Sequence, residues 1–82
     1  MSAFAYVNVE DVPLQLRETS VQRLDDNASI TLIYFDGCPL VGQCEVGKQR
    51  QIEYPFPRVP ELRNSLVEWL LHWGINFYVM AD

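Results

Sequence analysis

The sequence predicts an α+β domain in which one amphipathic helix packs across an antiparallel sheet of four to five strands. Three observations support this fold class. Short stretches with a period of two, separated by turns, fill most of the chain before Pro55. A proline-rich corner, Pro55–Pro60, then interrupts regular structure. Apolar residues at helical spacing follow and stop before Gly74. At 82 residues and 49% hydrophobic, the chain is predicted to form a single domain around one core.

The first predicted strand is Ala3–Val9, where β-branched and aromatic residues alternate in two sets. The segment Glu10–Pro13 interrupts this strand, because proline has no amide hydrogen to donate to a neighbouring strand. Leu14–Glu18 fits either an extended connection or one helical turn, and Thr19–Leu24 is a weak strand. We expect Ala3–Val9 to lie at a sheet edge, where it could support pairing with another chain.

The middle of the chain predicts an antiparallel meander. Ser29–Phe35 is apolar on both faces, which favours a central strand. Gly42 is a candidate bulge in the next strand. The predicted strands are Ser29–Phe35, Leu40–Val46 and Gln51–Tyr54, and the predicted turns are Asp25–Ala28, Asp36–Pro39 and Gly47–Arg50.

The helix is predicted over residues 60–73. Pro60 suits the first helical turn, and Glu61 complements the helix dipole. Gly74 can end the helix in a left-handed conformation. The apolar stripe that should pack on the sheet is Leu62, Leu66, Trp69, Leu70 and Trp73. Ile75–Ala81 is then the closing strand, paired within the sheet.

The charge distribution bears on the class of partner. The formal net charge is −5, and the whole excess lies in residues 1–47, which hold seven acidic residues and two arginines. Residues 48–82 hold four residues of each sign. Nucleic-acid binders need positive charge to neutralise phosphates, so direct binding to DNA or RNA is disfavoured. An acidic surface favours a basic protein partner.

The sequence contains no recognisable catalytic or metal-binding motif. Cys38 and Cys44 are expected to be reduced thiols, since an extended strand would hold them too far apart for a disulfide. Together with His72 they lack the close pair and the fourth ligand of a zinc site. We therefore predict no enzymatic activity, no metal and no cofactor. No apolar run is long enough to span a membrane, and no signal peptide is evident, so we expect a cytoplasmic protein without membrane contact.

The predicted contact surface combines acidic turns with an aromatic anchor. Asp25 and Asp26, adjacent at a hairpin tip, should present the densest charge. Phe56 lies between two prolines and is expected to be exposed and rigid. The full set of predicted partner-binding residues is Asp25, Asp26, Glu10, Asp11, Tyr54 and Phe56.

The segment Glu68–Val79, which ends a helix at Trp73-Gly74 and enters a strand through Asn76 and Tyr78, resembles small phage-encoded anti-CRISPR proteins. This resemblance implies an inhibitor that occupies a basic surface of a CRISPR effector complex in the host cytoplasm. It transfers no functional residue, because that group shares no catalytic signature. Two alternatives remain: a structural or assembly subunit of a phage or bacterial machine, for which a homodimer is possible, and an immunity-type inhibitor of a basic toxin.

Overall fold

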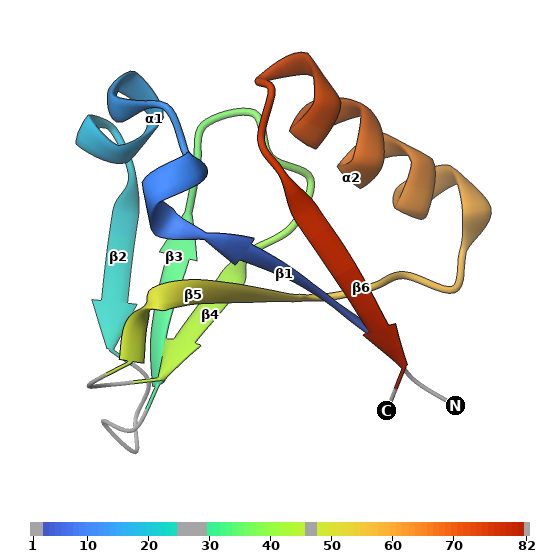
Figure 1. The fold of residues 1–82 in the computed structure, drawn as a ribbon, viewed down its shortest axis with the longest axis horizontal. Helices are drawn as coiled ribbons and strands as arrows, with labels where there is room; N and C mark the ends of the chain where they lie inside the picture. Colours follow the sequence, from blue (N-terminus) through green and yellow to red (C-terminus); the bar gives the residue numbers. More distant parts are fainter. Residues whose placement is uncertain (1–2, 25–29, 46–47, 82) are drawn as a thin grey trace.

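The computed structural model describes residues 3–24, 30–45 and 48–81, and leaves out the side chains of residues 48 and 49. The described residues form one antiparallel sheet of six strands with its helices on one side (Figure 1). The α+β prediction is confirmed, and the sheet has one strand more than expected. The elements are β1 (Ala3–Asn8), η1 (Val9–Asp11), α1 (Leu14–Glu18), β2 (Val21–Leu24), β3 (Ile30–Tyr34), β4 (Gly42–Glu45), β5 (Lys48–Pro55), α2 (Pro60–His72) and β6 (Phe77–Ala81).

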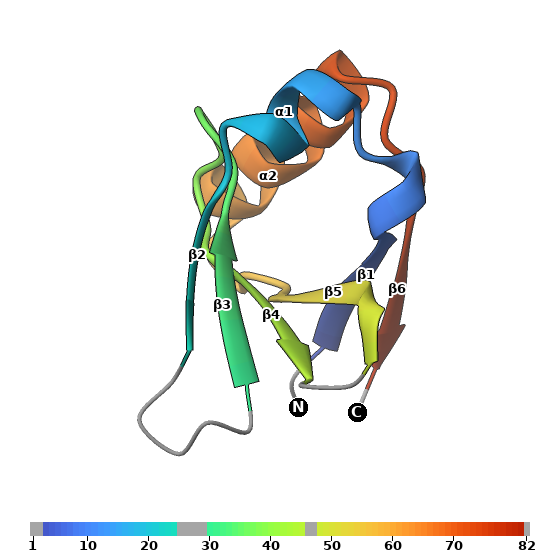
Figure 2. The same ribbon diagram turned by 90° about the vertical axis from the view of Figure 1, so that its left-hand side faces the viewer.

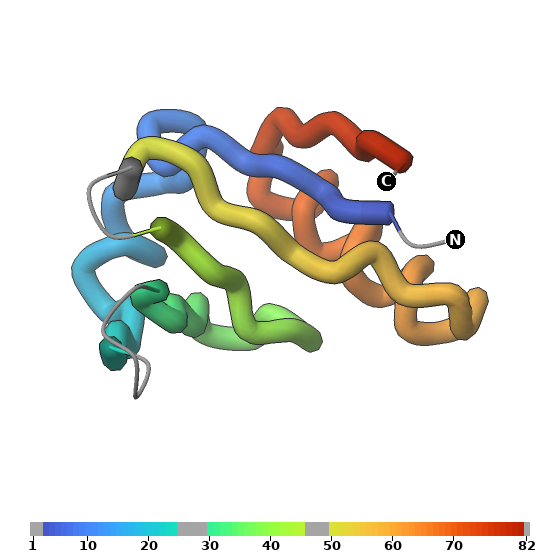
Figure 3. Tube along the Cα trace, turned by 90° about the horizontal axis from the view of Figure 1, so that it is seen from below, coloured from blue at the N-terminus to red at the C-terminus, as the bar shows by residue number. Residues whose placement is uncertain are grey.

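The strand order is β2-β3-β4-β5-β1-β6. The predicted meander is confirmed for β2 to β5, which pair in chain order. The expected edge position of Ala3–Val9 is wrong, because β1 lies between β5 and β6 (Figure 3). After α2 the chain returns alongside β1, where Phe77 pairs with Val7 and Ala81 with Ala3. The two edges of the sheet are therefore β2 and β6.

Both α1 and α2 lie over the same side of the sheet (Figure 2). Leu66 and Leu70 of α2 are fully buried and belong to one cluster with Ile52 and other strand residues. Trp69 and Trp73 are half-buried against this cluster, whereas Leu62 is exposed. The predicted apolar stripe is thus buried toward the C-terminal half of the helix. The side of the sheet that packs against the helices is called the covered face below, and the other side the open face.

The end of α2 follows the predicted glycine stop. Gly74 has a φ of 67°, in the left-handed region. Its amide donates to the Leu71 carbonyl at 3.1 Å, and the Ile75 amide donates to the Leu70 carbonyl at 2.9 Å. These two bonds form a Schellman motif, which satisfies carbonyls at the helix end. The motif also directs the buried Ile75 side chain into the core before β6 begins.

The structure corrects or refines four details of the sequence analysis. Leu14–Glu18 is helical, with Leu16 buried. The strand predicted over Gln51–Tyr54 extends back to Lys48, which pairs with Glu45, so the turn predicted over Gly47–Arg50 is wrong from Lys48 onward. The pairing irregularity lies between Gln43 and Glu45. Gly42 instead provides close packing, since a Cβ there would lie 2.4 Å from Ile52 Cγ2.

No helix in the described residues is long and apolar enough to cross a membrane.

Candidate functional site

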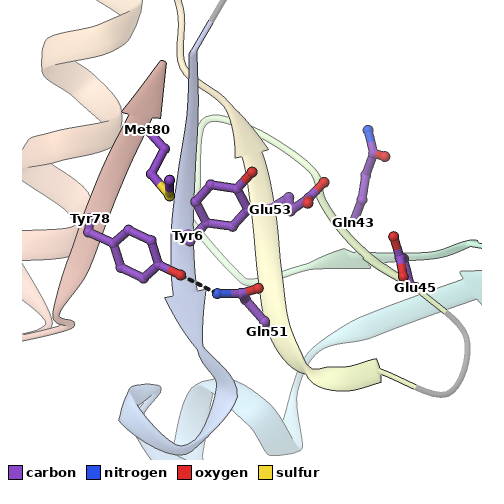
Figure 4. A pocket seen from close by; sticks show the side chains of 7 residues that line it. All are labelled: Tyr6, Gln43, Glu45, Gln51, Glu53, Tyr78 and Met80. Atoms are coloured by element: carbon purple, nitrogen blue, oxygen red, sulfur yellow. Dashed lines mark hydrogen bonds between the residues drawn. The ribbon is translucent and has the colours of Figure 1, made fainter. Parts of the chain in front are cut away.

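A groove of about 360 Å³ lies on the open face, across the middle and the β6 end of the sheet (Figure 4). Strands β1, β4, β5 and β6 each contribute to it. The lining side chains are Tyr6, Gln43, Glu45, Gln51, Glu53, Tyr78 and Met80. These side chains offer a ligand two carboxylates, two amides, two phenol rings and a thioether.

The strand register explains why these residues meet. Directly paired residues of neighbouring strands point to the same face of a sheet. Gln43 pairs with Glu53, Glu53 with Tyr6, and Tyr6 with Tyr78. This single row crosses four strands and joins residues that are far apart in the sequence. Glu45, Gln51 and Met80 lie beside the row and complete the groove.

Two stacked tyrosines form the β6 side of the groove. The ring centroids of Tyr6 and Tyr78 are 5.2 Å apart, and the rings are inclined by 23°. The Gln51 amide nitrogen donates a hydrogen bond to the Tyr78 hydroxyl. Figure 4 shows the amide oxygen of Gln51 pointing away from Tyr78. This hydrogen bond fixes the orientation of the Gln51 amide. Its oxygen is then free of Tyr78 and can accept a hydrogen bond from a ligand.

The opposite side of the groove is acidic. Glu53 is half-buried on β5, and Glu45 is exposed at the end of β4. Carboxylates accept hydrogen bonds from cationic donors, and the face of a tyrosine ring attracts cations. A groove with a tyrosine wall on one side and carboxylates on the other therefore suits a cationic group that is also flat enough to lie against a ring.

The four predicted partner-binding residues that the structure describes do not line this groove. Glu10 and Asp11 are exposed, but they lie on η1 beyond the end of β1. Phe56 is half-buried and packs against the core, so its predicted exposure is wrong. Asp25 and Asp26 lie outside the described residues.

Tyr54 cannot serve as the predicted anchor, because its side chain is only 1% exposed. It lies on the covered face, one residue from Glu53, and its hydroxyl is hydrogen-bonded to the Cys38 thiol. Burial raises the pKa of Tyr54, and the nearby Cys38 raises it further. The physical reason for the correction is the period of two along β5, which points Ile52 and Tyr54 into the core and Gln51 and Glu53 outward.

Both cysteines are buried, form no disulfide in the structure and lie near Tyr54. Burial raises the pKa of Cys38 and of Cys44, and Glu53 adds to the shift at Cys44. A raised pKa keeps a thiol protonated and a poor nucleophile. Among residues 3–24, 30–45 and 48–81, no group of three or more His, Cys, Asp or Glu residues could hold a metal ion.

One pattern in the sequence indicates part of the groove. The alternation in Ala3–Val9 puts Ala5 and Val7 on one face, and both are buried. Tyr6 must then face the other way, together with whatever pairs with it.

Comparison with protein-family models, with curated proteins and with solved structures found no match to this chain. The resemblance to anti-CRISPR proteins stays a prediction.

Proposed function

We propose that this chain acts without catalysis, by binding a basic partner protein through the groove on the open face. In this proposal an arginine side chain of the partner lies against the Tyr6–Tyr78 wall and donates hydrogen bonds to Glu53. The observation that carries it is the stacked tyrosine pair directly beside a carboxylate, both held by strands of the sheet.

An arginine suits this arrangement better than a lysine. The guanidinium group is planar, stacks on aromatic rings and presents several donors in a fixed fork. It can therefore contact the tyrosine wall and a carboxylate at the same time, and the Gln51 amide oxygen offers a third acceptor. A lysine ammonium is a compact point charge that gains less from a flat wall.

The specific form of the proposal is inhibition of a nucleic-acid-targeting complex. Surfaces that bind nucleic acids carry arginine and lysine to neutralise phosphates. A domain with a net charge of −5 that docks on such a surface would exclude the nucleic acid from it. The negative charge should also speed association at low salt, and this effect should weaken as salt is added.

The test compares binding of hexa-arginine and hexa-lysine peptides by isothermal titration calorimetry. We expect the arginine peptide to bind more tightly than the lysine peptide of equal charge. Glu53→Gln should weaken arginine binding by about tenfold, since hydrogen bonds to charged groups contribute roughly 1.5–3 kcal/mol. The matched control is Glu68→Gln, which removes the same charge from an exposed position on α2.

The control should retain most of the parental affinity, apart from the small loss caused by the change in net charge. Equal affinities for the two peptides, together with equal losses in the two variants, would show non-specific attraction to an acidic protein. That result would refute the groove as the binding site.

A further inference from the structure

The two edges of the sheet differ in how they are protected against pairing with another chain. Proteins usually protect an edge strand with charged side chains, prolines or bulges. Strand β2 carries Arg23 among its four residues. Strand β6 has none of these devices, since Phe77–Ala81 contains no charged residue and no proline. Its three central side chains are nevertheless exposed, Tyr78 by 48%, Val79 by 42% and Met80 by 55%.

We infer that β6 pairs antiparallel with β6 of a second copy of this chain, about a two-fold axis at Val79. Residues opposite each other in a continuous sheet must share a face, so the axis has to pass through a residue position. Val79 is the middle of the five-residue strand, and an axis there pairs the strand over its whole length. In this register Tyr78 lies opposite Met80 of the second copy, and Phe77 lies opposite Ala81.

The side chains in this register are self-complementary. Each copy places a Tyr78 ring beside a Met80 thioether, and sulfur–aromatic contacts are favourable. No charged residue of either strand is brought opposite another, although each chain has a net charge of −5. Strand β2 has four residues and so offers fewer pairing positions than β6, and pairing centred on its Arg23 would oppose two like charges, which destabilises a strand pair. A second copy therefore fits the β6 edge better than the β2 edge.

The pairing also continues the groove. Tyr78 and Met80 line the groove and are the residues of β6 that point to the open face. Because Met80 pairs with Phe4 within one copy, the dimer extends the row from Tyr6 and Tyr78 to Met80 and Phe4 of the second copy. Two grooves would lie next to each other on one continuous sheet, and each would gain a thioether wall from its neighbour.

The oligomeric state tests this inference without any ligand, so its outcome is independent of the proposed function. Sedimentation velocity over a concentration series should show a monomer–dimer equilibrium for the parent chain. Val79→Lys places two ammonium groups on the axis and should raise the dissociation constant at least about tenfold. Val21→Lys makes the same change on the exposed β2 edge and should leave the dissociation constant unchanged.

A parent chain that stays monomeric at every concentration would overturn the inference. Loss of the dimer in Val21→Lys, or its survival unchanged in Val79→Lys, would also overturn it. Circular dichroism of each variant establishes that the fold is retained.

Cross-linking gives a second measurement that does not depend on a disruptive variant. Val79→Cys places a thiol on the axis, where two thiols on directly opposed strand residues come within disulfide range. Mild oxidation should convert it to a covalent dimer. Leu71→Cys, at a 66% exposed position on α2, is the control for random collision and should stay monomeric under the same conditions. Equal cross-linking of the two variants would contradict the β6 pairing.

Discussion

The two faces of the sheet use neighbouring residues of the same strands for different purposes. On β5, Ile52 and Tyr54 point into the core, while Gln51 and Glu53 line the open groove. On β1, Val7 is buried and Tyr6 forms part of the tyrosine wall. One step along a strand thus separates a residue that stabilises the fold from one that faces a ligand. Substitutions on the covered face should therefore mainly lower stability, whereas substitutions on the open face should mainly weaken binding.

The largest effect is expected from the helix that packs against the covered face. Leu70→Ala removes a fully buried side chain and should lower the free energy of unfolding by about 2–5 kcal/mol. Leu71→Ala, at the adjacent but exposed position, should change it by no more than about 0.5 kcal/mol. Urea denaturation of both variants measures the difference. Equal losses would show that the helix packs on the sheet through another face.

Gly42 tests how tightly the covered face is packed. A Cβ at this position would lie 2.4 Å from Ile52 Cγ2 and 3.1 Å from the Tyr54 ring. Gly42→Ala should therefore destabilise the protein by about 1–3 kcal/mol through overpacking. In the double variant with Ile52→Ala the clashing methyl is gone, so the combined loss should be smaller than the sum of the single losses. Strict additivity would mean that the two residues do not compete for the same space.

Alkaline pH should destabilise the protein through the buried groups on the covered face. The folded state raises the pKa of Tyr54 above its ordinary value of 10.0, and those of Cys38 and Cys44 above 9.0. Above about pH 9 the unfolded chain loses these protons while the folded chain keeps them, so the free energy of unfolding falls as pH rises. Each fully titrating group contributes at most about 1.4 kcal/mol per pH unit.

This pH dependence can be measured by urea denaturation from neutral pH upward. Tyr54→Phe should make the decline shallower, because it removes one of the three groups. A free energy of unfolding that is constant or rises above about pH 9 would contradict the burial of these side chains.

The smallest effect on stability is expected from a matched pair of tyrosine variants. Tyr54→Phe removes a buried hydroxyl that bonds to Cys38, and should cost about 1 kcal/mol. Tyr78→Phe removes an exposed hydroxyl that accepts a bond from Gln51, and should change stability by less than about 0.5 kcal/mol. Tyr78→Phe should nevertheless weaken arginine-peptide binding, because the Gln51 amide loses its fixed orientation. If Tyr78→Phe lowered stability without weakening peptide binding, the roles assigned to the covered face and the open face would be wrong.

The parts of the fold set by local sequence were predictable. Helix α2 was predicted to within one residue, because Pro60 and Gly74 act on the adjacent backbone and the apolar spacing is local. The position of β1 between β5 and β6 was not predictable in this way. It depends on where the chain returns after α2, and pairing between segments far apart in the sequence has no local signature.

The candidate site was missed for the same reason. Tyr6 and Tyr78 come from opposite ends of the chain and meet only through the register of β1 with β6. Aromatic contacts were predicted at Tyr54 and Phe56, near the proline-rich corner, but both side chains pack in or against the core. The acidic composition indicated a cationic partner, but composition does not identify the strand face that would meet it.

The most direct test of the central claim uses the four tyrosines as reporters. Two of them, Tyr6 and Tyr78, form the groove wall, while Tyr54 is in the core and Tyr34 is on β3 away from the groove. NMR spectra of the tyrosine rings, recorded during titration with hexa-arginine, should show shifts at Tyr6 and Tyr78 that saturate together, with Tyr54 and Tyr34 unchanged. Saturating shifts at Tyr34 with Tyr6 and Tyr78 unchanged, or no response from any tyrosine, would contradict binding in the groove.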